Sequence, residues 1–443
     1  MKDFLQTRAE LQDLIGGEFV SECPEELLNK LGVPDADLLL VKPGSEQEVS
    51  AVLKYANMHG LSVIPIGNGQ QLHIGAMPRH ADILLSSQRL AGIVEHSAGD
   101  LTMTVRAGTP FSEVQEFLKL SGQFVPVTPP TLSGSTIGGL VATAANGPER
   151  VLYGSWRDIV IGLRVVYPNG EVIRSGGKVV KNVAGYDMNK LFVGSQGTLA
   201  FITEVTLKLR PYPKHRELIL AASARPGELI ELAERILASE CVPSALELIR
   251  TTEGGTVSYH LAVGSDEVES AAKYQADRIL EMAEQVSRGI VFTTLVNDEV
   301  EQFWLEYRSK WGQTDPEVLS VRAGFPIPRM TVLLDLYEKE ASSRGVEIQY
   351  SASLGTATLR IQLKDNEMEA PQAATRLHQT TSVLRELAEA NGGYLVIEHA
   401  SPNLKQDLGV WGTVRGGLSL MKGIKQTVDP NGILSPGRFV GGI

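Results

Sequence analysis

GGKVVKNVAGYDMNKLFVGSQGTL, at residues 176–199, is the most informative stretch of the sequence. It combines a glycine pair, further glycines and lysines, and it shows neither the period of a helix nor the alternation of a strand. Such glycines let the backbone approach another group closely, and a nucleotide cofactor is the group that we expect. The next residues, AFITEVTLKLR (200–210), alternate apolar and polar side chains, which predicts a half-buried strand directly after the glycine run.

Length and composition indicate a globular enzyme with more than one domain. The chain has 443 residues, of which 43% are hydrophobic and 21% are charged. These fractions are usual for globular proteins, and the length exceeds what one hydrophobic core normally organises. The 52 acidic side chains outnumber the 41 basic ones, so the formal net charge is −11. This charge argues against docking on nucleic acid or on an anionic membrane surface.

The cysteines and the N-terminal segment bear on the cellular compartment. Cys23 and Cys241 are too few for a disulfide framework or an iron–sulfur site, so we expect two reduced thiols and a cytoplasmic protein. The first residues show no apolar run of signal-peptide type, and no window has the apolar length of a membrane span. We therefore expect that any association with a membrane is made through a partner.

The first half of the chain alternates between expected helices and strands. A helix over 45–60 begins with a capping box of Ser45 and Glu48. A helix over 112–121 places Phe117 on its buried face. Strands are expected at 62–66, 81–86, 92–96 and 101–105, with a hairpin at 159–175.

The second half predicts a separate lobe with an antiparallel sheet. Beyond Pro213, helices are expected at 227–239, 265–286, 330–343 and 368–390, with strands at 217–223, 245–250, 258–263, 346–352, 356–363 and 394–399. No repeat with matching residues is found, which leaves a duplicated fold within 215–400 as an open alternative. Trp304, Tyr307 and Trp311 recur at helical spacing, and we interpret them as core side chains.

Two more glycine-rich segments precede residues 176–199. PIGNGQ (65–70) follows a buried strand, and STIGGLVATAANG (135–147) follows a long loop rich in Gly and Pro. Small residues in such loops let backbone N–H groups face a pyrophosphate, although a tight turn or a tight helix start explains either segment alone. Neither segment matches the P-loop or the GxGxxG fingerprint. The three segments together favour a bound nucleotide.

These segments, taken in order with the run at 153–209 and the tail DPNGILSPGR (429–438), resemble flavin-linked oxidases of the vanillyl-alcohol oxidase type. Within that superfamily, residues 176–199 are most similar to the FAD-binding subunits of bacterial glycolate oxidases. The resemblance implies an α+β fold in which two subdomains hold FAD and an α+β cap domain covers it. It divides the chain into a helical lead-in (1–37), an FAD-binding domain (38–214), a cap (215–420) and a tail that returns to the FAD-binding domain (421–443).

The resemblance also implies which residues contact FAD. We expect noncovalent binding, because no motif for a covalent flavin is present. The implied contacts lie in the three glycine-rich segments and beside them: Ile66, Gly67, Asn68, Gly69, Gln70, Gln71, Pro129, Thr136, Gly138, Gly139, Ala142, Tyr153, Gly154, Asp158, Lys181, Gly197 and Ile202.

The implied reaction is the oxidation of glycolate, a 2-hydroxy acid, to glyoxylate, together with a second flavin subunit and an iron–sulfur subunit. Because flavin supplies the hydride chemistry, the protein needs a clamp for the carboxylate and a base for the hydroxyl proton. Arg322 and Arg360 are the candidates for the clamp, and His399 is the candidate for the base. Ion-paired arginines and a histidine that is only hydrogen-bonded at a strand end are open alternatives.

Two other functions stay open at this point. One is a self-sufficient flavin dehydrogenase for another 2-hydroxy acid such as D-lactate. The other is a catalytically weak flavin-binding scaffold or electron-relay subunit. Retention of all three glycine-rich segments argues against a scaffold that has lost its flavin.

No metal is expected. Related D-2-hydroxy-acid dehydrogenases bind a metal through two histidines of one loop and a later Glu-His pair. Ser351 and Thr358 stand at the positions of those histidines in this sequence. Glu398 and His399 remain, but one carboxylate and one imidazole are too few ligands to close a divalent metal site.

Overall fold

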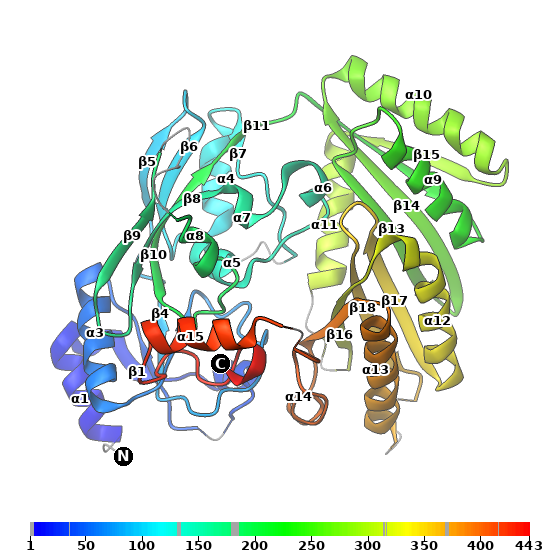
Figure 1. Ribbon diagram of the computed structural model, residues 1–443. Coiled ribbons are helices and arrows are strands. Elements are labelled where there is room, and N and C mark those ends of the chain that lie inside the picture. Colours follow the sequence, from blue (N-terminus) through cyan, green and yellow to red (C-terminus); the bar gives the residue numbers. More distant parts are fainter. Residues whose placement is uncertain are drawn as a thin grey trace. The chain divides into compact units, whose positions relative to one another are not determined.

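The structure is a computed structural model that describes residues 4–34, 36–130, 134–178, 186–312, 315, 317–367, 372–414 and 416–443. The chain forms two compact units (Figure 1). Unit 1 comprises Met1–Ala145, Ser155–Tyr212 and Val414–Ile443, and unit 2 comprises Asn146–Gly154 and Pro213–Thr413. Helices and strands mix in both units, which confirms the predicted α+β class.

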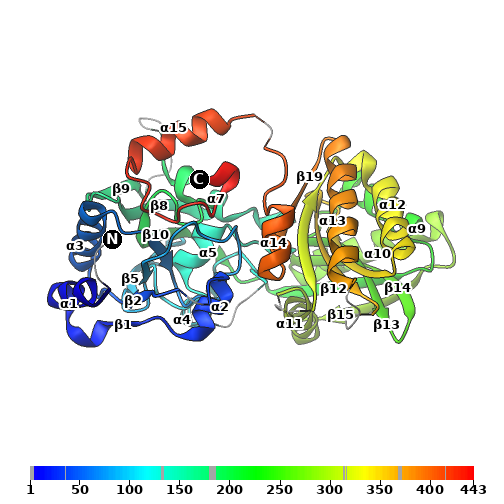
Figure 2. The same ribbon diagram turned by 90° about the horizontal axis from the view of Figure 1, so that it is seen from below.

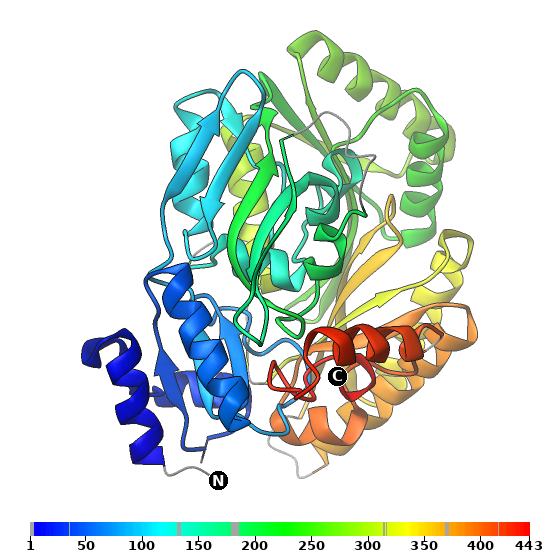
Figure 3. The same ribbon diagram turned by 60° about the vertical axis from the view of Figure 1, so that its left-hand side comes forward.

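The first sheet of unit 1 has the strand order β1-β2-β4-β3. Strands β2, β4 and β3 are parallel, and β1 is antiparallel to β2. Helices α1 and α3 lie side by side (Figure 3) and share one apolar cluster with these strands. The bounds are α1 Phe4–Ile15, β1 Val20–Glu22, α2 Glu25–Leu31, β2 Leu39–Val41, α3 Glu46–His59, β3 Val63–Ile66 and β4 Ile83–Ser86.

The capping box predicted for α3 is present in a modified form. The Ser45 hydroxyl accepts the backbone N–H of Glu48 at 3.1 Å, as predicted. The Glu48 carboxylate accepts the N–H of Gly44 at 2.7 Å rather than that of Ser45. The helix ends at Gly60, whose φ of 64° lies in the left-handed region that closes helices.

The second sheet of unit 1 is antiparallel, with the order β5-β6-β10-β8-β9. Its core contains Phe111, Val114 and Leu118 of α4. The prediction that Phe117 also faces the core is wrong, because its side chain is 38% exposed and packs edge-on against His96 at the margin of the helix. The bounds are β5 Ile93–Ser97, β6 Thr102–Arg106, α4 Phe111–Lys119, α5 Ile137–Thr143, α7 Trp156–Ile159, β8 Val160–Val166, β9 Val172–Gly176, α8 Asn189–Phe192 and β10 Phe201–Lys208.

The C-terminal segment of unit 1 pairs with the first sheet. Helix α15 (Leu418–Val428) ends before Asp429 and Pro430, and the chain then runs beside β3. The N–H of Ser435 donates to the Val63 carbonyl at 2.9 Å. A two-stranded ribbon of β7 (Gln123–Phe124) and β11 (Arg210–Pro211) completes the strands of this unit within the described residues.

Unit 2 is built on an eight-stranded antiparallel sheet with the order β15-β12-β14-β13-β17-β18-β16-β19. The order of elements along the chain is β-α-β-β-α-β twice, and the two halves join where β13 pairs with β17. The bounds of the first half are β12 His215–Ala222, α9 Pro226–Ala238, β13 Ala245–Glu253, β14 Thr256–Glu267, α10 Glu269–Val286 and β15 Val291–Val296. Those of the second half are β16 Leu319–Gly324, α12 Met330–Ser343, β17 Val346–Ser353, β18 Thr358–Asp365, α13 Ala373–Ala390 and β19 Tyr394–His399. This is the duplicated fold that the sequence left open.

Helices cover the two faces of this sheet unequally. Helices α9, α10, α12 and α13 lie on one face, and α11 (Asp298–Gly312) lies on the other (Figures 1 and 2). Trp304, Tyr307 and Trp311 of α11 are buried, which confirms their interpretation as core side chains. Two short helices, α6 (Arg150–Tyr153) and α14 (Pro402–Leu408), complete the helices described in this unit.

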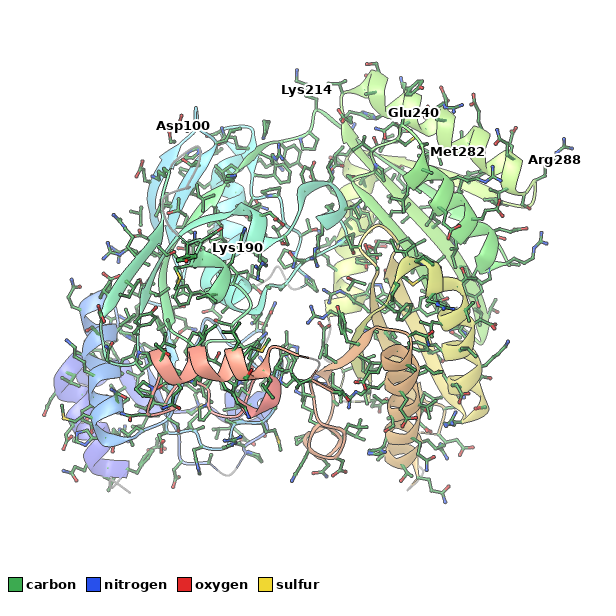
Figure 4. The ribbon with its side chains drawn as sticks, in the orientation of Figure 1. Asp100, Lys190, Lys214, Glu240, Met282 and Arg288 are labelled. Atoms are coloured by element: carbon green, nitrogen blue, oxygen red, sulfur yellow. The ribbon has the colours of Figure 1, made fainter. Side chains whose placement is uncertain are left out.

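The helix expected at 265–286 begins only at Glu269, because β14 stays paired with β12 as far as Glu267. Cys23 and Cys241 are free thiols, as predicted. Charged side chains such as Asp100 and Arg288 project from exposed turns and helix ends (Figure 4). In the described part of the chain, no helix has the length and apolar character needed to cross a membrane.

Candidate functional site

A cavity that opens to solvent lies within unit 1. Three segments that are far apart in the sequence form its wall: the end of β3 with the following loop, the start of α5, and the residues that lead into β10. Ser87, just after β4, and Arg438 of the C-terminal tail complete the lining.

Most residues predicted to contact FAD line this cavity. They are Ile66, Gly67, Asn68, Gly69, Gln70, Gln71, Thr136, Gly138, Gly139, Ala142, Gly197 and Ile202. The structure thus brings residues of all three glycine-rich segments to one cavity.

The other predicted contacts lie elsewhere or are not described. Pro129 is buried in the loop before α5 and is not among the lining residues. Asp158 accepts the N–H and the hydroxyl of Ser155 at 2.8 and 2.7 Å, so it caps α7. Tyr153 and Gly154 belong to unit 2, where the Tyr153 hydroxyl donates to Asp266 at 3.0 Å. Lys181 lies outside the described residues.

The glycines of the cavity wall show why side chains are excluded there. A Cβ atom on Gly67 would stand 2.0 Å from the Thr136 hydroxyl, and one on Gly138 would stand 2.7 Å from the Ala107 Cβ. These two glycines are therefore required by the packing of the protein itself. Gly139 differs, because its Cβ would meet only the Thr136 hydroxyl, at 3.1 Å. The wall here is bare backbone, which suits a nucleotide that must approach peptide N–H groups closely.

Hydrogen bonds hold the first two glycine-rich segments together. The Asn68 amide donates to the Gly134 carbonyl at 2.9 Å, and the Thr136 hydroxyl accepts the N–H of Gly139 at 3.3 Å. The Ser86 hydroxyl donates to the Gly67 carbonyl at 3.0 Å. The cavity wall is consequently organised by the protein's own contacts.

Arg438 adds a positive charge that our sequence analysis did not assign. Its side chain is 5% exposed, and Nη2 donates to the carbonyls of Leu72 and Ile74 at 2.8 and 2.6 Å. Burial lowers the pKa of this guanidinium to about 10, so it remains a cation at neutral pH. A buried cation in the cavity wall suits the diphosphate of FAD. The available signal was its position at the end of DPNGILSPGR.

Unit 2 brings the two predicted clamp arginines together. Arg322 and Arg360 are directly opposite each other on β16 and β18. Glu398 pairs with both, through Arg322 Nε at 3.2 Å and Arg360 Nη1 at 3.4 Å. Arg360 Nη2 also donates to the Asn146 carbonyl at 2.8 Å. The arginines are ion-paired, and one carboxylate shared by two guanidinium groups leaves an excess of positive charge.

His399 is held at the end of β19 by a backbone contact. Its Nε2 lies 3.1 Å from the carbonyl oxygen of Asp315. Because a carbonyl can only accept, Nε2 carries the proton and Nδ1 is the basic nitrogen of the neutral ring. Burial, together with the nearby Lys405 cation, lowers the pKa of His399. The ring is therefore neutral at pH 7, as a base requires.

A third polar group in unit 2, centred on Glu247 of β13, was missed by the sequence analysis. Glu247 is 3% exposed and accepts the Ser351 hydroxyl at 2.7 Å. The Tyr307 hydroxyl lies 3.2 Å from the same carboxylate oxygen and 2.8 Å from the Ser351 hydroxyl. Burial raises the pKa of Glu247 to about 7. A carboxylate in the apolar strand ALELIR was the only signal.

In the described ranges, no three or more His, Cys, Asp or Glu side chains are grouped so that they could hold a metal ion.

Two family models match the chain. Residues 38–176 match the FAD binding domain, and residues 212–439 match the C-terminal domain of FAD linked oxidases. Glycolate oxidase subunit GlcD of Bacillus subtilis is 29% identical over 92% of this chain and 89% of its own length. D-lactate dehydrogenase [cytochrome] of Arabidopsis thaliana is 26% identical over 94% of this chain and 75% of its own length. D-2-hydroxyglutarate dehydrogenase of Xanthomonas citri is 27% identical over 91% and 89%.

Solved structures agree with the fold. 4-ethylphenol oxidase from Gulosibacter chungangensis superposes with a TM-score of 0.75, at 18% identity, over 98% of this chain and 96% of that one. p-Cresol methylhydroxylase gives 0.75 at 15% identity over the same shares. Both family models and the glycine-lined cavity lead to one conclusion: the chain belongs to the FAD-linked oxidases, and FAD is its cofactor.

Proposed function

We propose that this chain oxidises a small 2-hydroxy acid to the 2-oxo acid, with glycolate as the first candidate substrate. The observation that carries the proposal is the pair of opposed arginines, Arg322 and Arg360, which share the single carboxylate of Glu398. The curated relatives support it, because their names specify glycolate, D-lactate and D-2-hydroxyglutarate. All three compounds are 2-hydroxy acids.

The residues of unit 1 would hold the cofactor. Backbone around Gly67 and Gly139 would face its diphosphate, and Arg438 would supply the compensating charge. When bound, FAD supplies the two-electron acceptor for the hydride that leaves C2 of the substrate. The protein is left with binding, orientation and proton transfer.

The residues of unit 2 would handle the substrate. Arg322 and Arg360 would bind its carboxylate through charge-assisted hydrogen bonds, with Glu398 fixing both guanidinium planes. His399 Nδ1 would accept the proton of the C2 hydroxyl, since Nε2–H is committed to the Asp315 carbonyl. Loss of that proton and of a hydride from C2 converts the alcohol into the carbonyl of the 2-oxo acid.

The chain would work as a subunit of a larger oxidase. The relative from Bacillus subtilis is named as a subunit of glycolate oxidase, and it spans nearly the same length. A second flavin subunit and an iron–sulfur subunit are the partners that the sequence resemblance implies. A self-sufficient D-lactate dehydrogenase is the second candidate, because a relative of that name covers most of the chain.

Steady-state assays test the proposal. The protein is loaded with FAD and assayed with glycolate, D-lactate and D-2-hydroxyglutarate, with a dye as electron acceptor. Turnover of one of them at rates of about 1 s⁻¹ or more supports an enzyme that acts on 2-hydroxy acids. Full FAD occupancy without turnover of any of them would favour the scaffold or electron-relay function.

A further inference from the structure

The Glu247 carboxylate occupies an apolar environment. Its neighbours along β13, Ala245 and Ile249, belong to an apolar cluster that also contains Trp304 and Trp311 of α11. An ionised carboxylate is costly in such surroundings, whereas a protonated one is not. The Ser351 and Tyr307 hydroxyls offset part of this cost by donating to the charged form. Both protonation states are therefore accessible near neutral pH, in accord with the pKa of about 7 that burial produces.

Strand register connects Glu247 to the arginine pair. Ser351, the hydrogen-bond partner of Glu247, is directly opposite Arg360 across β17 and β18. Arg360 is in turn directly opposite Arg322. Glu247, Ser351, Arg360 and Arg322 therefore form a row of polar side chains across one face of the sheet. The Arg360 cation is close enough to lower the pKa values of both Glu247 and Tyr307 against the dominant effect of burial.

The charge of this row depends on Glu247. Arg322 and Arg360 contribute two positive charges and Glu398 contributes one negative charge. With Glu247 protonated the row carries one net positive charge, and with Glu247 ionised it is neutral. A carboxylate ligand at the arginines is attracted by the first state and not by the second.

We propose that Glu247 takes up a proton when a carboxylate binds at Arg322 and Arg360, so that binding of the substrate anion is proton-coupled. The inference rests on the proposed function, because it assumes the arginine clamp. Glu247 would be a positioning residue that acts through Ser351 and Arg360, without touching the substrate.

The sign of the coupling follows from linkage. A bound anion disfavours ionised Glu247, so the pKa of Glu247 is higher in the complex than in the free protein. Affinity for the anion is then full below about pH 7 and falls as the pH rises, by at most about tenfold per pH unit for one proton.

The other groups around Glu247 do not account for the pH dependence of anion binding. Strand β14 places uncharged Ala262 opposite it, and β17 contributes the hydroxyls of Ser351 and Ser353. Helix α11 contributes Tyr307, whose pKa burial raises well above its usual value. Strand β18 contributes the permanent cation of Arg360.

Oxamate is a suitable probe because it is a carboxylate anion that has no hydrogen on C2 and so cannot be oxidised by loss of a hydride. Its carboxylate stays ionised from about pH 5.5 to about pH 8.5, so the probe itself takes up no proton in this range. Calorimetric titration of the FAD-loaded protein, in two buffers with different heats of ionisation, gives both the dissociation constant and the number of protons taken up. For the wild-type protein we expect uptake of up to about one proton near pH 7.5 and a dissociation constant that rises toward alkaline pH.

Glu247→Gln is the decisive variant. The amide is a fixed neutral group of the same shape, so oxamate should bind with an affinity independent of pH and without proton uptake. Tyr307→Phe keeps the carboxylate but removes a donor to its charged form, so the pH dependence should move to higher pH. His399→Asn is the matched control, and it should keep the wild-type proton uptake.

The outcomes separate this inference from the proposed function. Proton uptake that is unchanged in Glu247→Gln would overturn the proposed coupling. If Glu247→Gln does not fold, a Tyr307→Phe variant whose oxamate affinity has the same pH dependence as the wild-type protein would overturn it as well. Turnover of a 2-hydroxy acid with oxamate binding that shows no proton uptake would refute the coupling and leave the enzyme function intact. Absence of both oxamate binding and turnover in the wild-type protein would refute the arginine clamp, and the inference with it.

Discussion

Arg322 and Arg360 carry like charges at directly opposed positions of an antiparallel sheet, which costs free energy unless anions neutralise them. Glu398 supplies one such anion, at 3.2 and 3.4 Å from the two guanidinium groups. Two guanidinium groups offer more N–H donors than one carboxylate can accept, and a planar carboxylate ligand matches their geometry. At the scale of single residues, this surplus of donors is the feature that specifies an acidic substrate.

Removing either guanidinium should weaken substrate binding. For Arg322→Gln and for Arg360→Gln, we expect the KM for the 2-hydroxy acid to rise by ~10–100-fold, because each variant loses a charge-assisted hydrogen bond of ~1.5–3 kcal/mol. Steady-state kinetics with the dye acceptor measure this change, and the FAD content checks that unit 1 is intact. Lys364→Gln is the matched control, since Lys364 lies on β18 but pairs with Glu317. A KM that stays the same in both arginine variants would exclude the clamp.

At the scale of elements, the packing contact between the loop after β3 and the start of α5 determines the shape of the cavity. Gly67 has no room for a side chain because the Thr136 hydroxyl occupies the space, and that hydroxyl also caps α5 through the N–H of Gly139. The same atom thus sets both the helix start and the distance between two glycine-rich segments. Packing within the protein, and not only contact with FAD, accounts for these glycines.

A double-mutant cycle measures the interaction free energy between positions 67 and 136. Gly67→Ala should lower the free energy of unfolding by ~2 kcal/mol or more through overpacking, and Thr136→Ala by ~1 kcal/mol through loss of the cap. Because Thr136→Ala removes the atom that the new Cβ would meet, the double variant should be more stable than the sum of the two losses predicts. Chemical denaturation followed by circular dichroism provides the values. Strictly additive losses would contradict the close approach.

The elements themselves were mostly predictable. Capping residues and periodicity indicated α3 and α12 to within a residue or two, because local sequence dominates there. The position of Phe117 was predicted wrongly, since helical period alone does not say how wide the buried face is. Residues 265–267 continue β14 instead of starting α10, because pairing with β12 outweighs local preference for a helix.

The site residues were predictable only where they lie close together in the sequence and form a recognisable motif. The three glycine-rich segments were found because glycine runs have a distinct local pattern, and their convergence on one cavity agrees with the resemblance. Glu247 could not be found in this way. Its partners, Ser351 and Tyr307, come from other elements, and a carboxylate between leucines has no local signature of its own.

At the scale of the whole molecule, the two units differ in what a bound cofactor should do to them. Each unit has its own hydrophobic clusters, and every residue that lines the cavity belongs to unit 1. A ligand that binds only the folded form stabilises the part of the chain that holds it. The duplicated sheet of unit 2 has no part in the cavity lining.

Removal of FAD should therefore destabilise unit 1 selectively. We expect thermal unfolding of the FAD-free protein to show an early transition, and FAD at ~100 times its dissociation constant to stabilise that transition by ~2.7 kcal/mol. Calorimetry gives the transitions. Tryptophan fluorescence is followed in a Trp156→Phe variant, which lacks the buried tryptophan of unit 1, so that the signal reports on unit 2 through Trp304, Trp311 and Trp411. If FAD stabilised the fluorescence-detected transition as much as the early one, the independence of the two units would be refuted.

The most direct test of the account is the visible absorption spectrum of the FAD-loaded protein before and after a 2-hydroxy acid is added without oxygen. We predict that glycolate or another 2-hydroxy acid bleaches the flavin absorbance and yields one equivalent of 2-oxo acid per flavin, and that Arg360→Gln bleaches much more slowly at the same concentration. A flavin that dithionite reduces, but that stays oxidised with glycolate, D-lactate and D-2-hydroxyglutarate alike, would contradict the assignment of this chain as a 2-hydroxy-acid oxidoreductase.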